Sequence, residues 1–217
     1  MSNTESFIEE VTEEVQRDRL FLLMRRYGWI AVLLVVLVVG GAAYNEWQKA
    51  RKIAAAEAVG NGVLAALEAD DPSERVSALS GISADAESAA VLALLMAAES
   101  QIAEDLPTAR TALESIVSDE TLPEVYRNLA TFKLVLLEGT ESPVEDRRAA
   151  LESIAAPGAP YRLLAEEQLA MIDVETGETD AAIARLQSLM LDTEATAGLR
   201  RRASQLIVAL GGSLAAS

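Results

Sequence analysis

The longest apolar stretch of the chain runs from Tyr27 to Asn45, nineteen consecutive residues without a charge. Val, Leu, Ile, Ala and Gly make up most of it, so a helix here is apolar on every side. Such a helix is about 28 Å long, close to the ~30 Å of bilayer hydrocarbon, and satisfies its own backbone hydrogen bonds, as lipid demands. Aromatic side chains stand at its two ends, as they do at headgroup level: Tyr27, Trp29, Tyr44 and Trp47. The pattern predicts an uncleaved transmembrane helix at residues 27–45.

A buried core helix and a cleaved signal peptide are the alternatives to a span. Core helices are rarely apolar all round over this length. The acidic and polar residues 1–26 that precede the run are not typical of a signal peptide. Four basic residues precede the span and three follow it, and this small excess favours a cytoplasmic N-terminus. These residues are Arg17, Arg19, Arg25 and Arg26 before the span and Lys49, Arg51 and Lys52 after it.

The segments on either side of the span also have helical periodicity. Residues 1–26 place apolar side chains at spacings of three and four, which predicts either an amphipathic helix or a disordered tail. Residues 46–71 continue as an Ala-rich exit helix, which Gly60-Asn61-Gly62 is expected to kink or break. The sequence Asp70-Asp71-Pro72-Ser73 predicts the end of this helix, with Pro72 in the first turn of the next.

Beyond residue 72 two patterns recur. A Leu-x-x-Ile/Leu pattern repeats at spacings of 34, 38 and 35 residues, at Leu79/Ile82, Leu113/Ile116, Leu151/Ile154 and Leu186/Leu189. A Tyr-Arg-x-Leu-Ala pattern occurs at Tyr126–Ala130 and Tyr161–Ala165, and more faintly at Leu199–Ala203. A period of ~34 residues made of two helices is that of tetratricopeptide arrays, in which stacked helix pairs share a continuous core.

The repeats predict longer and shorter helices in alternation. We expect the longer helices at 86–103, 123–138, 160–175 and 196–210, and the shorter ones at 73–80, 107–118, 144–155 and 179–191. The predicted fold is all-α, with a single N-terminal transmembrane helix followed by a tetratricopeptide-like α-solenoid of helix pairs. The expected divisions are a cytoplasmic tail at 1–26, the span at 27–45, the exit helix at 46–71, the helical repeats at 72–212 and a tail at 213–217.

Composition limits the chemistry of the chain. The net charge is −16, and residues 46–217 carry 28 acids against 14 bases. An acidic domain repels nucleic acid and anionic headgroups, so neither is expected as its partner. The chain has no His and no Cys, hence no imidazole base, no thiol nucleophile and no usual zinc set. We therefore expect no enzyme activity, no metal, no cofactor and no small-molecule substrate.

Pairs of adjacent carboxylates recur along the chain. Neighbouring positions of a helix point in different directions, so such a pair does not converge on one substrate atom. We expect these carboxylates to lie on solvated faces. The pairs are Glu9-Glu10, Glu13-Glu14, Asp70-Asp71 and Glu166-Glu167.

Tyrosine and basic residues on the longer helices are the candidate partner-binding side chains, because Tyr and Arg are favoured at interfaces. They are Tyr126, Arg127, Lys133, Tyr161, Arg162 and Arg200–Arg202. In the alternative interpretation, the Tyr rings pack between repeats and the Arg side chains pair with neighbouring acids. The sequence leaves both open.

The layout resembles that of the YfgM-type ancillary subunits of the bacterial Sec translocon, whose helical domain is similar to that of CpoB-type proteins. The matching features are Arg25-Arg26-Tyr27-Gly28-Trp29, Trp47-Gln48 and the exit-helix run Ala54–Leu67. The resemblance implies a protein of the inner membrane whose helical domain faces the periplasm. It also implies association with the SecYEG channel and a PpiD-type membrane-anchored prolyl isomerase, and assistance to client polypeptides leaving the channel. The tetratricopeptide consensus is only partly met, so no peptide-clamp residues are transferred.

Two functional hypotheses follow. The first is a membrane-anchored, protein-binding scaffold or chaperone helper of the Sec translocon. The second is an assembly or structural factor of another inner-membrane complex, such as a respiratory, photosynthetic or cell-division complex, which would bind one fixed partner and no unfolded chains.

Overall fold

The computed structural model describes the backbone of residues 3–213 and the side chains of residues 25–26, 29–30, 33–85 and 87–213. All regular structure within these residues is helical, which confirms the all-α prediction. The chain divides into two units, Met1–Glu57 and Ala58–Ser217.

Residues 3–57 of the first unit lie within α1, which extends from Asn3 to Leu67. The side chains from Leu33 to Val39 are 49–67% exposed, although all are apolar. Among the described residues, no helix has the length and the hydropathy that crossing a membrane requires, so the predicted span at 27–45 is not confirmed. The side chains of the predicted amphipathic tail lie outside the described residues up to position 24.

The predicted break at Gly60-Asn61-Gly62 is wrong, because α1 continues through these residues; a kink there stays a prediction. A Cβ atom at Gly62 would lie 3.2 Å from Ile82 Cδ1. Gly62 thus lets the turn after α2 approach the last turns of α1, which is a packing role for a small residue. The predicted stop is confirmed, since α1 ends at Leu67 and α2 begins at Pro72. The Asp71 carboxylate caps α2 by accepting from the Ser73 N–H at 2.7 Å.

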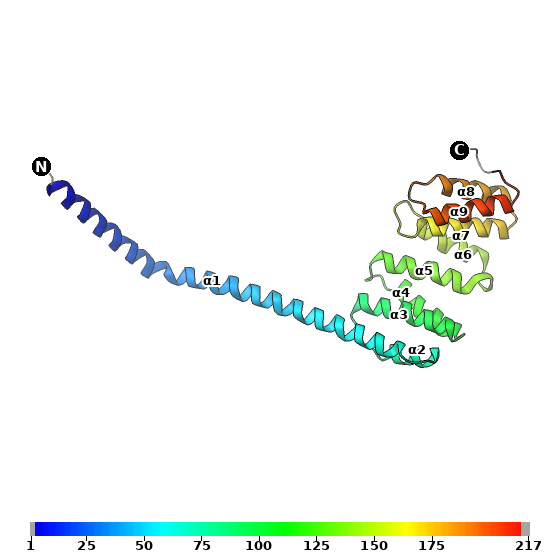
Figure 1. Cartoon of the computed structure of the whole chain (residues 1–217), viewed down its shortest axis with the longest axis horizontal. Coiled ribbons are helices and arrows are strands. Elements are labelled where there is room, and N and C mark those ends of the chain that lie inside the picture. The colour runs from blue at the N-terminus through cyan, green and yellow to red at the C-terminus, as the bar shows by residue number, and fades with distance from the viewer. Residues whose placement is uncertain (1–2, 214–217) are drawn as a thin grey trace. The chain divides into compact units, whose positions relative to one another are not determined.

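The second unit stacks helices in chain order (Figure 1). The longer helices are α3 (Ala86–Ile102), α5 (Glu124–Glu138), α7 (Arg162–Glu175) and α9 (Ala197–Ala209). The shorter ones are α2 (Pro72–Ser80), α4 (Leu106–Val117), α6 (Val144–Ile154) and α8 (Thr179–Leu191), with a 3₁₀ turn η1 (Gly139–Glu141) before α6. Every predicted helix of this region is present, with its ends within two residues of the expected positions.

Each shorter helix lies at the centre of one buried cluster. Leu79, Leu113, Leu151 and Leu186 are 0–1% exposed, so the first Leu of the repeated pattern is the core residue of its repeat. The clusters join the end of α1 with α2 and α3, α3 with α4 and α5, α5 with α6 and α7, and α7 with α8 and α9. Each of α3, α5 and α7 therefore contributes to two clusters, which makes the core continuous.

The second sequence pattern also ends on a buried residue in α5, α7 and α9. Its last residue is Ala130, Ala165 or Ala203, and each is fully buried. A methyl side chain at these positions lets neighbouring helices approach without a cavity.

The turns that follow the longer helices repeat as well. Each contains one residue with positive φ, at Glu104, Gly139, Gly177 and Gly211, which are 35, 38 and 34 residues apart. This left-handed conformation ends a helix and reverses the chain, and it favours glycine. Only the first of these turns uses a residue with a side chain.

Candidate functional site

The two candidate tyrosines lie in different surroundings. Tyr126, in the first turn of α5, packs against the cluster that contains Leu113 and Ala130. Tyr161 immediately precedes α7, is partly buried and lines a surface groove. Tyr126 thus packs between repeats, as the alternative interpretation expects, whereas part of the Tyr161 side chain lines a groove. A binding role for either remains a prediction.

Arg162 is engaged by acids that follow α8. Its Nη2 atom lies 2.8 Å from Asp192 Oδ2 and 2.7 Å from Glu194 Oε2. The hydrogen bond to Glu194 and, to a smaller extent, the one to Asp192 raise the pKa of Arg162 above its ordinary value. This charge links α7 to the α8–α9 turn, as the pairing alternative expects.

Two of the α9 arginines are also engaged, whereas Arg201 is exposed and makes no ion pair with a described side chain. Arg200 donates to the backbone oxygen of Asp192 at 2.8 Å. Arg202 donates two hydrogen bonds of 2.7 Å to the Glu167 carboxylate on α7. Glu167 is only 7% exposed, so the expectation that Glu166-Glu167 lies on a solvated face is wrong for this residue. The adjacency of Glu166 and Glu167 gave no indication of Arg202, the partner of Glu167 that lies 35 positions away.

Arg127 and Lys133 on α5 differ from the other candidates. The Arg127 Nε atom is buried and has no hydrogen-bond partner within the described structure. The Lys133 side chain is partly buried and makes no ion pair with any described side chain. The structure therefore does not bring the predicted candidates together as one strip. Tyr126 packs in the core and Tyr161 lines a groove. Arg162, Arg200 and Arg202 are hydrogen-bonded, whereas Arg127 and Lys133 form no ion pair with a described side chain.

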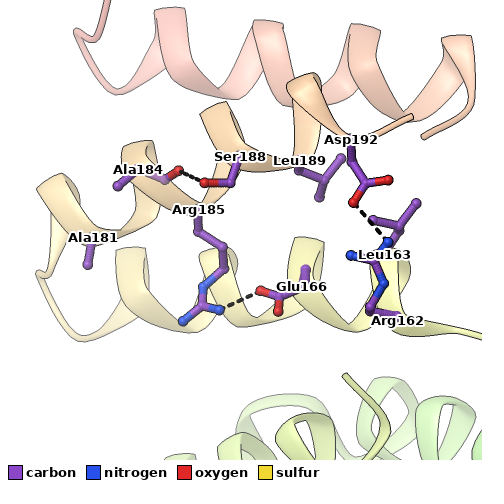
Figure 2. Close-up of a pocket in the computed structure, with 9 residues that line it drawn as sticks. All are labelled: Arg162, Leu163, Glu166, Ala181, Ala184, Arg185, Ser188, Leu189 and Asp192. Atoms are coloured by element: carbon purple, nitrogen blue, oxygen red, sulfur yellow. Dashed lines mark hydrogen bonds and ion pairs between the residues drawn. The ribbon is translucent and has the colours of Figure 1, made fainter. Parts of the chain in front are cut away.

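A groove of about 490 Å³ lies between α7 and α8 (Figure 2). Its apolar part is formed by side chains such as Leu163 and Leu189. Two ion pairs border it, Arg162 with Asp192 and Arg185 with Glu166. The remaining polar contact in Figure 2 is internal, because the Ser188 hydroxyl donates to the backbone oxygen of Ala184 at 3.0 Å.

A second groove, of about 560 Å³, adjoins the first at Arg162 and Leu163. It is lined by the segment 158–164 and by Glu194, Thr196 and Leu199. The charged side chains that line both grooves form ion pairs with one another. The apolar and aromatic surfaces of the grooves are suited to contacts with another polypeptide.

Comparison with protein families identifies the repeat. The family model described as tetratricopeptide repeat-like domain matches residues 25–158, more than half of the chain. The chain belongs to this tetratricopeptide repeat-like family. No curated protein and no solved structure matches it.

The tetratricopeptide-like architecture continues beyond the matched residues. The buried cluster of α7, α8 and α9 follows residue 158 and has the same long–short–long arrangement as its predecessors. Repeat domains of this kind are typically non-catalytic modules for protein–protein interaction. No three His, Cys, Asp or Glu side chains among those described converge as metal ligands.

The ion pairs of Arg75 and Arg147, which join neighbouring tetratricopeptide-like helices, are the contacts that sequence reasoning missed. Arg75 on α2 pairs with Glu99 on α3 at 2.6 Å, and Arg147 on α6 with Glu175 on α7 at 2.6 Å. Both arginines stand four residues before the first Leu of their repeat. The recurrence of Arg before that Leu, with an acid near the end of the next helix, was a signal in the sequence.

Proposed function

We propose that this chain is a membrane-anchored, protein-binding scaffold. The observation that carries the proposal is the row of seven exposed apolar side chains from Leu33 to Val39. Each of these side chains is unfavourable in water by about 25 cal/mol per Å² of apolar surface. Because they face all sides of α1, one protein groove would not cover them, whereas lipid would. The uncharged run from Tyr27 to Asn45 has the length of a bilayer core.

The partners proposed are the SecYEG channel, a PpiD-type membrane-anchored prolyl isomerase and client polypeptides leaving the channel. This follows from the resemblance to YfgM-type subunits and is supported by the tetratricopeptide-like domain. In this arrangement the anchor crosses the bacterial inner membrane, the N-terminus is cytoplasmic and the helical repeats are periplasmic. The repeats then offer grooves beside α7 to polypeptides near the membrane.

Site-specific crosslinking tests the partners. A photoactivatable residue at position 161, within the groove beside α7, is expected to capture channel subunits, the isomerase or a translocating client from native membranes. The same residue at position 152, an exposed site on α6, is the matched control. If position 161 captures none of these proteins, the translocon assignment is rejected. A reporter fused to the C-terminus tests the topology, and a cytoplasmic location would reject it as well.

The alternative is an assembly or structural factor of another inner-membrane complex. The internal pairing of the groove charges is compatible with one fixed partner as well as with several clients. The full-length protein in detergent distinguishes the two functions. A translocon helper should slow the aggregation of an unfolded client, whereas an assembly factor should leave the aggregation rate unchanged and co-purify with one stoichiometric complex.

A further inference from the structure

Three side chains of α1 form an exposed aromatic and basic face immediately after the apolar run. The Tyr44 and Trp47 rings lie 6.1 Å apart, and Arg51 Cζ lies 4.8 Å from the centre of the Trp47 ring. Tyr44 is 60% exposed and Trp47 is 54% exposed. Spacings of three and four residues place these side chains on one side of the helix. The guanidinium of Arg51 is thus positioned by a cation–π contact while both rings remain accessible.

The charge of this segment is opposite to that of the rest of the domain. Residues 46–52 contain Lys49, Arg51 and Lys52 against Glu46, a net charge of +2. Residues 53–217 contain 27 acids and 11 bases, a net charge of −16. Residues 46–52, next to the apolar run, are therefore locally basic although the chain as a whole is acidic.

Among the side chains that the structure describes, these three cations lack the carboxylate partners that most arginines of the second unit have. In the second unit, arginines such as Arg75, Arg147 and Arg202 pair with carboxylates at 2.6–2.7 Å. Within the described side chains, Lys49, Arg51 and Lys52 make no ion pair, although the chain has an excess of acids. Three unpaired cations on the same stretch of helix as two exposed rings point to anions outside the chain.

We propose that Tyr44, Trp47, Lys49, Arg51 and Lys52 form a headgroup collar, a site that binds the anionic phosphates of phospholipids at the membrane surface. The proposal rests on the membrane anchor proposed above. If Tyr44 marks the edge of the hydrocarbon, a rise of ~1.5 Å per residue places Lys49 to Lys52 about 7–12 Å beyond it. This range begins within the headgroup layer, which is roughly 5–8 Å thick on each side. The flexible stems of Lys and Arg reach back over the remaining distance.

The collar has a defined recognition chemistry. The planar Arg51 guanidinium can donate two parallel hydrogen bonds to one phosphate, while Lys49 and Lys52 act as point charges. The aromatic rings are suited to the boundary between hydrocarbon and headgroups. An anionic surface would attract the collar and so fix the depth of α1 in the bilayer.

Lipid selectivity of the full-length protein tests the collar. The protein is reconstituted in phosphatidylcholine vesicles with phosphatidylglycerol, and spin-labelled forms of both lipids report which one the protein binds. We expect the wild type to prefer phosphatidylglycerol, with a contribution of roughly fivefold per basic residue at low salt. The variant Lys49→Gln/Arg51→Gln/Lys52→Gln should lose most of this preference. The charge-conserving variant Lys49→Arg/Arg51→Lys/Lys52→Arg should retain it, and high salt should weaken it.

The outcomes separate the collar from the anchor. If the wild type fails to float with pure phosphatidylcholine vesicles, both the anchor and the collar are rejected. If it floats but binds the two lipids equally, or if the triple Gln variant keeps its preference, the collar alone is rejected.

Discussion

Arg148 Nη1 on α6 lies 2.7 Å from Asp173 Oδ1 on α7, and the Asp173 side chain is only 2% exposed. The second carboxylate oxygen of Asp173 accepts from Arg185 Nε on α8 at 3.0 Å. One buried carboxylate thus joins three consecutive helices. Because a buried charge without partners is strongly unfavourable, both arginines are needed to keep Asp173 ionised in this position.

We predict that Asp173→Asn lowers the free energy of unfolding by about 2–3 kcal/mol, since it leaves two arginines facing a neutral group. The value lies toward the lower end for a broken buried pair because Arg148 and Arg185 are 21% and 29% exposed. Denaturant unfolding followed by circular dichroism measures it. Glu178→Gln is a matched control, because Glu178 pairs with the same Arg148 at 3.8 Å but is 59% exposed. Glu178→Gln should change the free energy of unfolding by less than ~0.5 kcal/mol. Equal effects of Asp173→Asn and Glu178→Gln would contradict a stabilising role for the buried ion pairs of Asp173.

The same carboxylate should make stability depend on pH. Burial raises the pKa of Asp173, but the hydrogen bonds and charges of Arg148 and Arg185 outweigh burial and hold that pKa below its ordinary value. A carboxyl with a depressed folded-state pKa stabilises the fold above its unfolded-state pKa, about 3.9, and loses this contribution as the pH falls through the folded-state value. The stability difference between wild type and Asp173→Asn should therefore be constant near neutral pH and shrink below about pH 4. A difference that stays constant into stronger acid would show that Asp173 does not titrate as described.

Much of the helical unit follows from its sequence. Leu113 and Leu151 stand in identical five-residue segments and occupy the same buried position, because a helix that packs on both neighbours needs one large apolar residue at its centre. Pro72 and Asp71 likewise mark a helix start through local chemistry alone. Signals that act within one turn of chain are therefore sufficient to place these helices.

The candidate site was less predictable, because its partners are remote in sequence. Arg162 meets Asp192 and Glu194 at separations of 30 and 32 residues, and no local pattern specifies those contacts. The glycines at Gly60 and Gly62 resemble a helix break, yet α1 continues through both, and Gly62 lies close to Ile82 in the turn after α2. Propensity is a weak guide where packing between elements opposes it.

Removing the centre of one repeat should destabilise the whole array. Leu151 is fully buried, so we predict that Leu151→Ala lowers the free energy of unfolding by about 3 kcal/mol through lost burial and the cavity left behind. Leu136→Ala on α5 is the control, because Leu136 is 50% exposed and its truncation leaves no closed cavity. Thermal and urea unfolding of both variants provide the measurement. A Leu136→Ala loss as large as that of Leu151→Ala would mean that Leu136 is covered in the folded protein.

Glu104 is the one side-chain-bearing residue among the described positive-φ turns, with φ of 59°. A non-glycine residue in the left-handed region is strained by about 1–3 kcal/mol. Glycine removes that strain but increases the entropy of the unfolded chain, an effect of about 0.4–1 kcal/mol. We therefore predict that Glu104→Gly raises the free energy of unfolding by about 0.5–1 kcal/mol.

Two variants make this last prediction specific to the turn. Gly177 occupies the equivalent position at φ 80°, and a Cβ atom there would meet no neighbouring group within 4 Å. Gly177→Ala should therefore lower stability by about 1 kcal/mol through backbone strain alone. Glu120→Gly changes the same residue type in an exposed turn whose φ is not positive, and it should lower stability by a few tenths to about 1 kcal/mol. Urea unfolding of the three variants tests the sign of each effect. If Glu104→Gly and Glu120→Gly destabilise the protein equally, the left-handed turn after α3 does not carry the strain that its φ implies.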